Sequence, residues 1–287
     1  MDKVLFSFGH GYSARALGRR LLPRGWRIYG TTRDAAKAET LRSEGVIPLL
    51  WDEDGDDIGP ALTEATHLLS SVGPNEDGDP VLSRHKDAIA RIAPRLAWTG
   101  YLSTTGVYGD HQGAWVDETT PLTPSTRRGK LRVAAEAEWQ AIPGLPLHVF
   151  RLAGIYGPGR GPFAKLREGT ARRIIKPGQV FSRIHVDDIA QVLEASMHAP
   201  CPAAVYNLCD DDPAPPEDVI AFAANLLGQP VPDEVAFDDA DLSPMARSFY
   251  SESKRVSNRR IRDTLGIQLI HPDYRSGLRA IIADDES

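Results

Sequence analysis

The chain has 287 residues, of which 41% are apolar and 25% charged, so it falls in the globular class rather than the disordered, collagen-like or coiled-coil classes. This length predicts one large domain, or one domain with an added lobe. With 33 basic and 39 acidic residues the formal net charge is −6. The acidic residues are spread along the chain, which argues against a nucleic-acid partner.

Short apolar runs alternate with amphipathic segments along the first half of the chain. A run of about 4–8 apolar residues predicts a buried strand, and apolar residues three or four positions apart predict a helix. Strands are predicted at residues 4–8, 26–31, 46–51, 67–72, 99–103 and 147–152, and helices at residues 13–24, 34–43, 81–94 and 131–142. This alternation with short joints is typical of βαβ units and predicts an α/β fold with a parallel sheet.

Cysteine usage and the lack of long apolar runs indicate the compartment. The two cysteines, Cys201 and Cys209, match neither a zinc motif nor a disulfide framework. No signal-peptide pattern follows Met1, and no stretch approaches the about 20 apolar residues of a membrane span. These patterns predict a cytoplasmic protein without a membrane partner.

A glycine run stands between the first predicted strand and the first predicted helix. It reads G-x-G-x-x-A, with a small residue in place of the third glycine. Such glycines let the backbone turn sharply and approach a pyrophosphate, whose charge meets the N–H groups of the helix start. A tight turn without a ligand is the alternative interpretation. The candidate cofactor-binding residues of this run are Gly9, Gly11, Tyr12, Ser13 and Ala14.

The end of the second predicted strand indicates which cofactor is bound. An NAD site usually has an acidic residue about 20 residues after the glycines. Thr32 and Arg33 stand here instead, and Arg33 can offer a bidentate fork to a 2′-phosphate, so NADP is favoured over NAD. The alternative is a solvated Arg33 beside Asp34 as a helix cap. Further cofactor candidates follow the third and fourth strands: Asp52, which equally well caps a turn, Ser70 and Ser71.

Four stretches occur in the order in which one protein family carries them. They are residues 9–14, 103–109, 151–160 and 183–190, which read GHGYSA, STTGVYG, RLAGIYGPGR and RIHVDDIA. Residues 206–208 and 254–258 add weaker matches. With these motifs the chain resembles the extended and atypical short-chain dehydrogenase/reductases, the group of the NAD(P)-dependent epimerase/dehydratase family. The resemblance implies a Rossmann-type, doubly wound parallel sheet with a dinucleotide across its carboxyl-terminal edge.

Domain boundaries are predicted from this resemblance and from a change in composition after Gly154. Glycine and proline cluster at residues 157–162, 176–178, 200–202 and 213–216. We expect residues 1–155 to form mainly the NAD(P)-binding Rossmann domain. Residues 156–287 should form mainly a substrate lobe, interleaved with the end of the sheet. No clean linker separates the two, so a single structural unit is predicted.

The resemblance also implies a catalytic set, from which this chain departs. The set comprises a serine or threonine, an acid/base tyrosine, a lysine four residues later and an upstream asparagine, because hydride transfer must be coupled to proton transfer. Thr104 falls at the hydroxyl position, although a strand-end threonine bonded to the backbone is the alternative. Arg128 and Arg132 stand at the tyrosine and lysine positions, and Asp79 is nearest to the asparagine position.

This departure leaves two functions open, because arginine stays protonated and cannot shuttle a proton as tyrosine does. In the first, the chain is an NADP-dependent epimerase, dehydratase or reductase of an unknown carbonyl or alcohol, such as a nucleotide sugar. Arg128 and Arg132 then stabilise negative charge, and another group moves the proton. In the second, it is a non-catalytic NADP-binding redox sensor or regulatory protein. The retained loop motifs favour the enzyme; a scaffold with an empty Rossmann fold is a third, less favoured alternative.

Substrate contacts are expected from the loops of the later motifs. Tyr108 and Tyr156 stand where tyrosines of the family contact substrate or are structural. Arg160 and Arg183 can bind a phosphate or carboxylate, so an anionic small molecule is the predicted substrate. Arg151, which lies on a predicted strand, is expected to be a buried structural partner instead.

The motif His185-Val186-Asp187-Asp188 is weighed as a metal site and rejected. Its neighbours are apolar and no further ligand is evident, so no metal is predicted. Asp187 or Asp188 is expected to cap a helix. The resemblance allows a monomer, or a homodimer formed through the helices that flank the nucleotide domain.

Overall fold

The computed structural model describes residues 3–52 and 55–285. Its strands are β1 (Val4–Phe8), β2 (Arg27–Thr32), β3 (Ile47–Leu50), β4 (His67–Ser70), β5 (Trp98–Thr104), β6 (Trp115–Val116), β7 (Leu147–Leu152), β8 (Gly154–Tyr156), β9 (Arg173–Ile175), β10 (Arg183–His185), β11 (Val205–Leu208), β12 (Glu234–Ala236) and β13 (Arg255–Val256). Its helices are α1 (Tyr12–Leu21), α2 (Ala35–Ser43), α3 (Gly59–Glu64), α4 (Pro80–Ile92), α5 (Arg127–Gln140), α6 (Phe163–Arg167), α7 (Val186–His198), α8 (Pro216–Leu226), α9 (Pro244–Phe249), α10 (Arg259–Leu265) and α11 (Tyr274–Asp285). Every helix of the described residues is too short or too polar to traverse a lipid bilayer.

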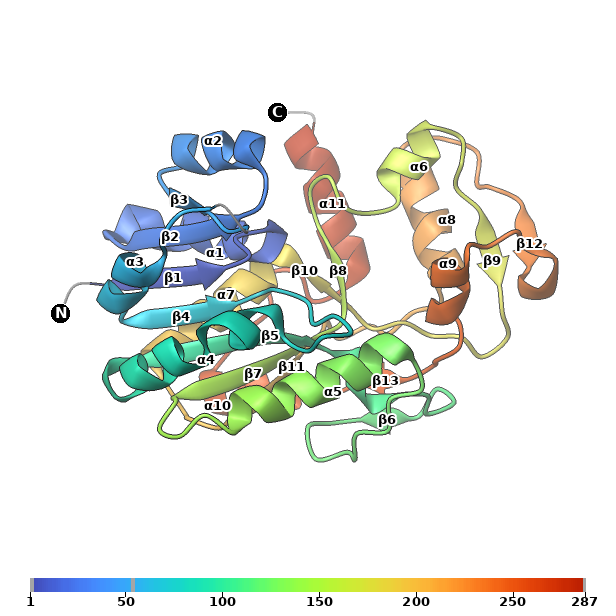
Figure 1. Cartoon of the computed structure of the whole chain (residues 1–287). Coiled ribbons are helices and arrows are strands. Elements are labelled where there is room, and N and C mark those ends of the chain that lie inside the picture. The colour runs from blue at the N-terminus through green and yellow to red at the C-terminus, as the bar shows by residue number, and fades with distance from the viewer. Residues whose placement is uncertain (1–2, 53–54, 286–287) are drawn as a thin grey trace. The chain divides into compact units, whose positions relative to one another are not determined.

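Seven strands form the central sheet, in the order β11-β7-β5-β4-β1-β2-β3. β1 pairs in parallel with β2 and β4, β2 with β3, and β4 with β5. The strand order runs outward in both directions from β1 and β4, which makes this pair the topological switch point of a doubly wound sheet. The Rossmann-type α/β fold predicted from the sequence is therefore confirmed (Figure 1).

The chain forms two compact units, each assembled from three segments. Unit 1 comprises Met1–Thr104, Lys130–Arg151 and Ile189–Tyr206. Unit 2 comprises Thr105–Gly129, Leu152–Asp188 and Asn207–Ser287. The expected boundary at residue 155 falls close to the junction between Arg151 and Leu152. However, residues 105–129, which precede this junction, belong to unit 2, and residues 189–206, which follow it, belong to unit 1.

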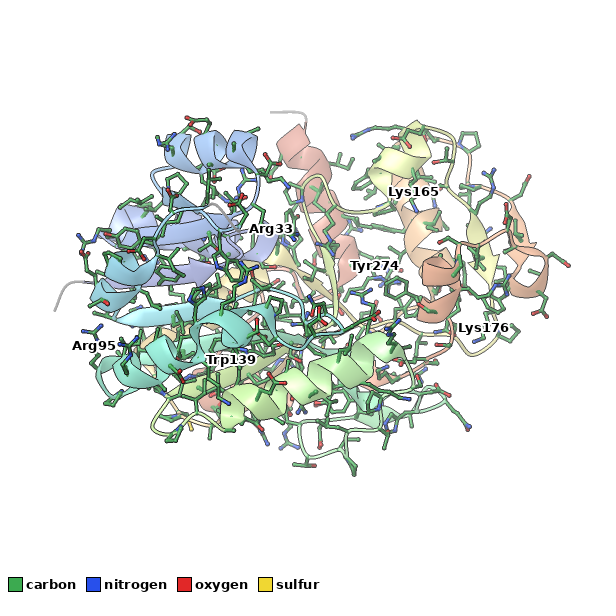
Figure 2. The ribbon with its side chains drawn as sticks, in the orientation of Figure 1. Arg33, Arg95, Trp139, Lys165, Lys176 and Tyr274 are labelled. Atoms are coloured by element: carbon green, nitrogen blue, oxygen red, sulfur yellow. The ribbon has the colours of Figure 1, made fainter. Side chains whose placement is uncertain are left out.

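The apolar core of unit 1 lies between the sheet and the helices α4 and α5. Phe6 and Phe8 of β1 are fully buried, with ring centroids 4.8 Å apart. Trp139 of α5, labelled in Figure 2, is also fully buried, and each such side chain contributes about 1.5–3 kcal/mol by leaving water. On α1 and just after it, Arg20 and Arg24 pair with Glu194 of α7. Apolar contacts thus hold α4 and α5 on the sheet, and ion pairs connect α1 and the turn after it to α7.

Predicted element bounds agree best where the apolar pattern is unbroken. β1 and β7 coincide with the strands predicted at 4–8 and 147–152. The helix α5 begins at Arg127 rather than at residue 131, because its first turn carries no apolar residue that periodicity would detect. The short helix α3 was not predicted, since it opens on Gly59 and Pro60 and is only six residues long.

Unit 2 has a separate apolar core between α6, α8 and α11. Three two-stranded parallel sheets belong to it, formed by β10 with β8, β12 with β9, and β13 with β6. Tyr274 of α11, labelled in Figure 2, is buried in this core. A Cβ on Gly277 of the same helix would collide with the ring of Tyr156, so glycine is required there for close packing.

Candidate functional site

The turn after β1 is built around Gly9, whose φ of +70° suits glycine far better than a residue with a side chain. A Cβ at this position would lie 3.0 Å from Val72 Cγ2 and 3.3 Å from Ser71 Oγ. These two residues follow β4, so the turn lies against the neighbouring strand end. The Gly9 N–H donates to Thr31 Oγ1 at 2.8 Å, which ties the turn to β2. Gly9 therefore marks the topological switch point between β1 and β4.

Gly11 precedes α1 and faces the open side of the same turn. It is exposed and extended, with φ −95°, and a Cβ there would meet only the Gly9 carbonyl oxygen at 3.8 Å. The first turn of α1 has no acidic residue to neutralise the positive end of the helix. Ser13 and Ala14 are buried beneath the turn, and Tyr12 is half-buried. This arrangement is typical of turns that bind a pyrophosphate.

The residues after β2 present a positive charge. Arg33 is exposed and has no ion-pair partner among the described residues (Figure 2). Thr32 is half-buried, and its hydroxyl accepts the Asp34 N–H at 3.2 Å. Asp34 caps α2 by accepting the N–H groups of Ala36 and Lys37, at 2.9 and 3.2 Å. The carboxylate nearest to Arg33 in sequence is therefore engaged by a helix start.

The other predicted cofactor residues follow β3 and β4. Ser70 ends β4, is fully buried, and its Oγ has no hydrogen-bond partner in the part of the chain that the structure describes. Ser71 donates its hydroxyl to the carbonyl oxygens of Gly9 and Phe8 and so braces the glycine turn. Asp52 is exposed after β3. Ser71 supports the turn directly, whereas no contact of Asp52 or Ser70 assigns either a role.

Arg132 of α5 reaches the carboxyl ends of β4 and β5. Its Nη1 donates to the Leu102 carbonyl oxygen at 2.8 Å, to the Tyr101 hydroxyl at 3.1 Å and to the Val72 carbonyl oxygen at 3.5 Å. Burial raises the pKa of the Tyr101 phenol well above its ordinary value. Thr104 is the last residue of β5 and is half-buried. A fixed cation and a hydroxyl thus lie at the same edge of the sheet as the glycine turn.

A buried ion pair lies behind Arg132 on the same helix. Glu136 accepts from Arg151 Nη2 at 2.8 Å and from Arg151 Nε at 3.2 Å, and it also accepts the Ser103 hydroxyl. Glu136 and Arg151 are 2% and 5% exposed. The structural role predicted for Arg151 fits this contact, while Glu136 was not anticipated. The only sequence signal for Glu136 is its position one helical turn after Arg132.

Two members of the predicted catalytic set, Arg128 and Asp79, have different environments: the first is exposed and the second is buried. Arg128 is the second residue of α5, is exposed, and forms no ion pair within residues 3–52 and 55–285. Asp79 is buried and caps α4, because its Oδ1 accepts the N–H groups of Val81 and Leu82 at 2.9 and 3.1 Å. Its Oδ2 accepts the Trp139 indole N–H at 3.0 Å. Both carboxylate oxygens of Asp79 thus accept hydrogen bonds that hold α4 and Trp139, which favours a structural role over a catalytic one.

The two tyrosines predicted to contact substrate are buried in unit 2. The Tyr108 hydroxyl donates to Asn207 Oδ1 at 2.7 Å. The Tyr156 hydroxyl donates to the Asp273 carbonyl oxygen at 3.3 Å, and burial raises the pKa of its phenol strongly. These contacts favour the structural role that the sequence left open for both tyrosines.

The two predicted anion-binding arginines differ in exposure. Arg160 is exposed in the turn after β8, where its N–H and carbonyl groups pair with those of Gly157. Arg183 donates to the carbonyl oxygens of Phe181 and Ala214 at 2.9 and 3.0 Å, and burial lowers its pKa. Arg160 is therefore the better placed of the two to meet a soluble anion.

His10, a buried histidine inside the glycine run, was not among the residues predicted from the sequence. His10 is 4% exposed, and neither ring nitrogen has a hydrogen-bond partner among the described residues. A Cβ on Gly30 would lie 2.8 Å from His10 Cβ, and one on Gly18 would lie 3.3 Å from His10 Nε2. Burial lowers the pKa of the His10 imidazole from 6.5 to about 4. The glycine turn therefore rests on a neutral ring for which two glycines leave room.

Known proteins resemble the chain over almost its full length. A solved structure from Silicibacter pomeroyi DSS, described as a functionally unknown conserved protein, is 62% identical, with a TM-score of 0.94 and coverage of 99% of this chain and 100% of that one. Protein YeeZ of Escherichia coli (strain K12) is 29% identical over 95% of this chain and 97% of its own length. The structure of the human epimerase family protein SDR39U1 (isoform2) with NADPH is 19% identical, with a TM-score of 0.76 over 98% of this chain and 99% of that one.

The likeness in fold agrees with the Rossmann-type sheet of unit 1. No family model matches the chain. Solved structures that are named as epimerases or dehydratases nevertheless share its fold over nearly the whole chain. The chain has the fold of the NAD(P)-dependent epimerase/dehydratase proteins, which is the family that its motifs resemble.

Proposed function

We propose that the chain binds NADP and acts as an oxidoreductase or epimerase on a small anionic carbonyl or alcohol compound. The observation that carries this proposal is the glycine turn of Gly9 and Gly11 at the switch point of the sheet, with an open side at the start of α1. Dinucleotides bind across the carboxyl ends of the strands in such folds. Thr32, Arg33 and Thr104 all stand at those ends in unit 1.

The choice of NADP over NAD rests on Arg33. A 2′-phosphate carries charge that an unpaired guanidinium can bind bidentately. Arg33 is exposed and unpaired among the described residues, and Asp34 is held by the first turn of α2. The NADPH complex of the human relative adds support for a nicotinamide cofactor.

Each residue of the sheet edge has a proposed task. The bound cofactor would donate or accept a hydride. Thr104 is proposed to hydrogen-bond the substrate oxygen, and Arg132 to hold negative charge with a guanidinium already anchored on Leu102 and Val72. Arg128 and Arg132 stay protonated, so the proton moves through another group.

The exposed Arg128 favours a second candidate function. It places a permanent positive charge where the family has an acid/base tyrosine. A chain that binds NADP but lacks this proton shuttle would not turn the cofactor over. Its function would then be that of a redox sensor or regulatory protein, which signals the state of the bound cofactor to another molecule. The two functions share the cofactor and differ in turnover.

A turnover assay separates the two functions. The purified chain is incubated with NADPH and a panel of nucleotide sugars and of phosphorylated or carboxylated ketones, and products are identified by mass spectrometry because epimerisation regenerates the cofactor. We expect turnover by the wild type, loss of roughly a hundredfold in Thr104→Val with NADPH binding intact, and wild-type rates in the control Thr264→Val. NADPH binding without turnover of any panel member, joined by activity after Arg128→Tyr with Arg132→Lys, would favour the sensor.

A further inference from the structure

Three potential metal ligands meet in unit 2. His185 ends β10, Asp187 lies in the first turn of α7, and His271 lies in the loop before α11. One ligand atom from each lies within 4.8 Å of the other two. The sequence around His185 offers no third ligand, and the fold supplies His271 from far along the chain. β10 and α11 are labelled in Figure 1.

The spacing of these atoms is too wide for hydrogen bonds and close to that of ligands around one ion. Asp187 Oδ2 lies 3.6 Å from His185 Nδ1 and 3.8 Å from His271 Nε2. Hydrogen bonds between such atoms span about 2.7–3.2 Å. Around a tetrahedral zinc ion with bonds of about 2.0–2.1 Å, ligand atoms lie about 3.4 Å apart. Small side-chain movements would therefore bring all three atoms onto a shared cation.

Burial of the two imidazoles also favours a metal site. His185 and His271 are 2% and 7% exposed, and their ring centroids lie 3.9 Å apart. His185 Nε2 is buried without a hydrogen-bond partner among the described residues. His185 Nδ1 accepts the Asp187 N–H, so in the neutral ring the proton lies on Nε2 and Nδ1 carries the lone pair that a metal ion would bind. The Asp187 side chain is 48% exposed, so an ion has a path from solvent on that side.

The surroundings hold the ligands in place. Asp188 accepts the N–H groups of Ile270 and His271 at 2.6 and 3.0 Å, which fixes the loop that carries His271. Such outer contacts orient metal ligands in known sites. His185 Nδ1 accepts the Asp187 N–H at 3.2 Å, a bond that an ion would replace. The carboxylates of Asp187 and Asp188 offset the positive end of α7 that a cation would meet.

We propose that His185, Asp187 and His271 bind one divalent transition-metal ion, of which Zn²⁺ is the representative. Two imidazoles and one carboxylate suit zinc and its neighbours better than Mg²⁺ or Ca²⁺, which take oxygen ligands. Three protein ligands leave the fourth position to water. This site uses none of the residues assigned to the cofactor and does not depend on the proposed function.

Calorimetry on the full, untagged chain tests the site. The protein is stripped with a chelator, dialysed and titrated with ZnCl₂, and CoCl₂ is added in parallel because a four-coordinate Co²⁺ site absorbs visible light strongly. We expect one ion per chain. His271→Ala and Asp187→Asn should each weaken Zn²⁺ binding by about a hundredfold or more, since even outer contacts are worth about 10–100-fold. The control His111→Ala removes a histidine of unit 2 outside the cluster and should bind as the wild type does.

Two results would overturn the proposal. One is a wild-type chain that binds no ion at millimolar Zn²⁺. The other is unchanged affinity in Asp187→Asn, which alters a half-exposed side chain by a single atom and should fold even if the buried His271→Ala variant does not. Circular dichroism of each stripped variant confirms that loss of binding is not loss of fold.

Discussion

Arg132 donates its Nη1 to the carbonyl oxygen of Leu102 at 2.8 Å and thereby fixes a guanidinium at the carboxyl end of β5. The same nitrogen reaches the Val72 carbonyl oxygen, and Val72 Cγ2 would lie only 3.0 Å from a Cβ on Gly9. A permanent cation and the glycine turn are therefore linked through one residue. This contact explains how a chain of net charge −6 can present a positive site locally.

Removing this cation should weaken cofactor binding. In Arg132→Met the acceptors on Leu102 and Tyr101 lose their donor, and the sheet edge loses its charge. We expect NADPH affinity to fall roughly tenfold or more and the free energy of unfolding to fall by about 1–3 kcal/mol. Calorimetry and urea denaturation measure the two effects. Arg132→Lys keeps the charge and should recover part of the affinity; equal NADPH affinity in Arg132→Met and the wild type would refute the role.

Replacing Arg33 should change the cofactor preference. A hydrogen bond from a guanidinium to a phosphate contributes about 1.5–3 kcal/mol. In Arg33→Ala the affinity for NADPH should therefore fall roughly 10–150-fold, while the affinity for NADH stays as in the wild type. The matched control is Arg91→Ala, because Arg91 is exposed near the end of α4, which leads to the amino end of β5. A parallel loss of NADH affinity, or no loss at all, would contradict the assignment.

Breaking the buried ion pair should destabilise unit 1. Glu136→Ala leaves the guanidinium of Arg151 buried without its carboxylate. Removing one partner of such a pair costs about 3–5 kcal/mol. Denaturant unfolding should show a loss of this size, against less than about 1 kcal/mol for Glu138→Ala on the same helix. A loss in Glu136→Ala no larger than in the control would show that the pair contributes little.

Acid should destabilise the chain in part through His10. Its pKa is about 4 in the folded chain against 6.5 when unfolded, so the unfolded chain takes up the proton first as the pH falls. The stabilising effect is complete above pH 6.5, is lost between about pH 6.5 and 4, and amounts to about 3 kcal/mol. His10→Phe keeps a ring without this proton. Unfolding free energies measured across that range should fall less steeply with acid in the variant, and identical slopes would contradict the prediction.

The strands β1 and β7 could be predicted most accurately because they are buried on both faces. All five residues of β1 and all six of β7 are buried, and their limits can be found directly in the sequence. The glycine run was recognisable because its neighbours are a strand and a helix. The capping role of Asp79 does have a sequence signal, because an aspartate directly before a proline is typical of a helix start.

The contacts that depend on distant residues could not be predicted. Glu136 and Arg151 lie on a helix and a strand whose periodicity reports burial but not which charges meet. His271 joins His185 only because a loop folds back onto the start of α7. The lone sign of His10 was its place between two glycines, where its ring fills the space left by Gly18 and Gly30.

The most direct test is a calorimetric titration of NADPH into the wild type, Gly11→Ala and Gly161→Ala. Both glycines have room for a Cβ, since Gly11 would meet only one oxygen at 3.8 Å and Gly161 nothing within 4 Å. We predict one NADPH per wild-type chain, unchanged binding in Gly161→Ala and roughly tenfold or greater loss in Gly11→Ala, whose methyl group occupies the approach of the pyrophosphate. No binding at millimolar NADPH, or equal affinity in Gly11→Ala and the wild type, would contradict the account.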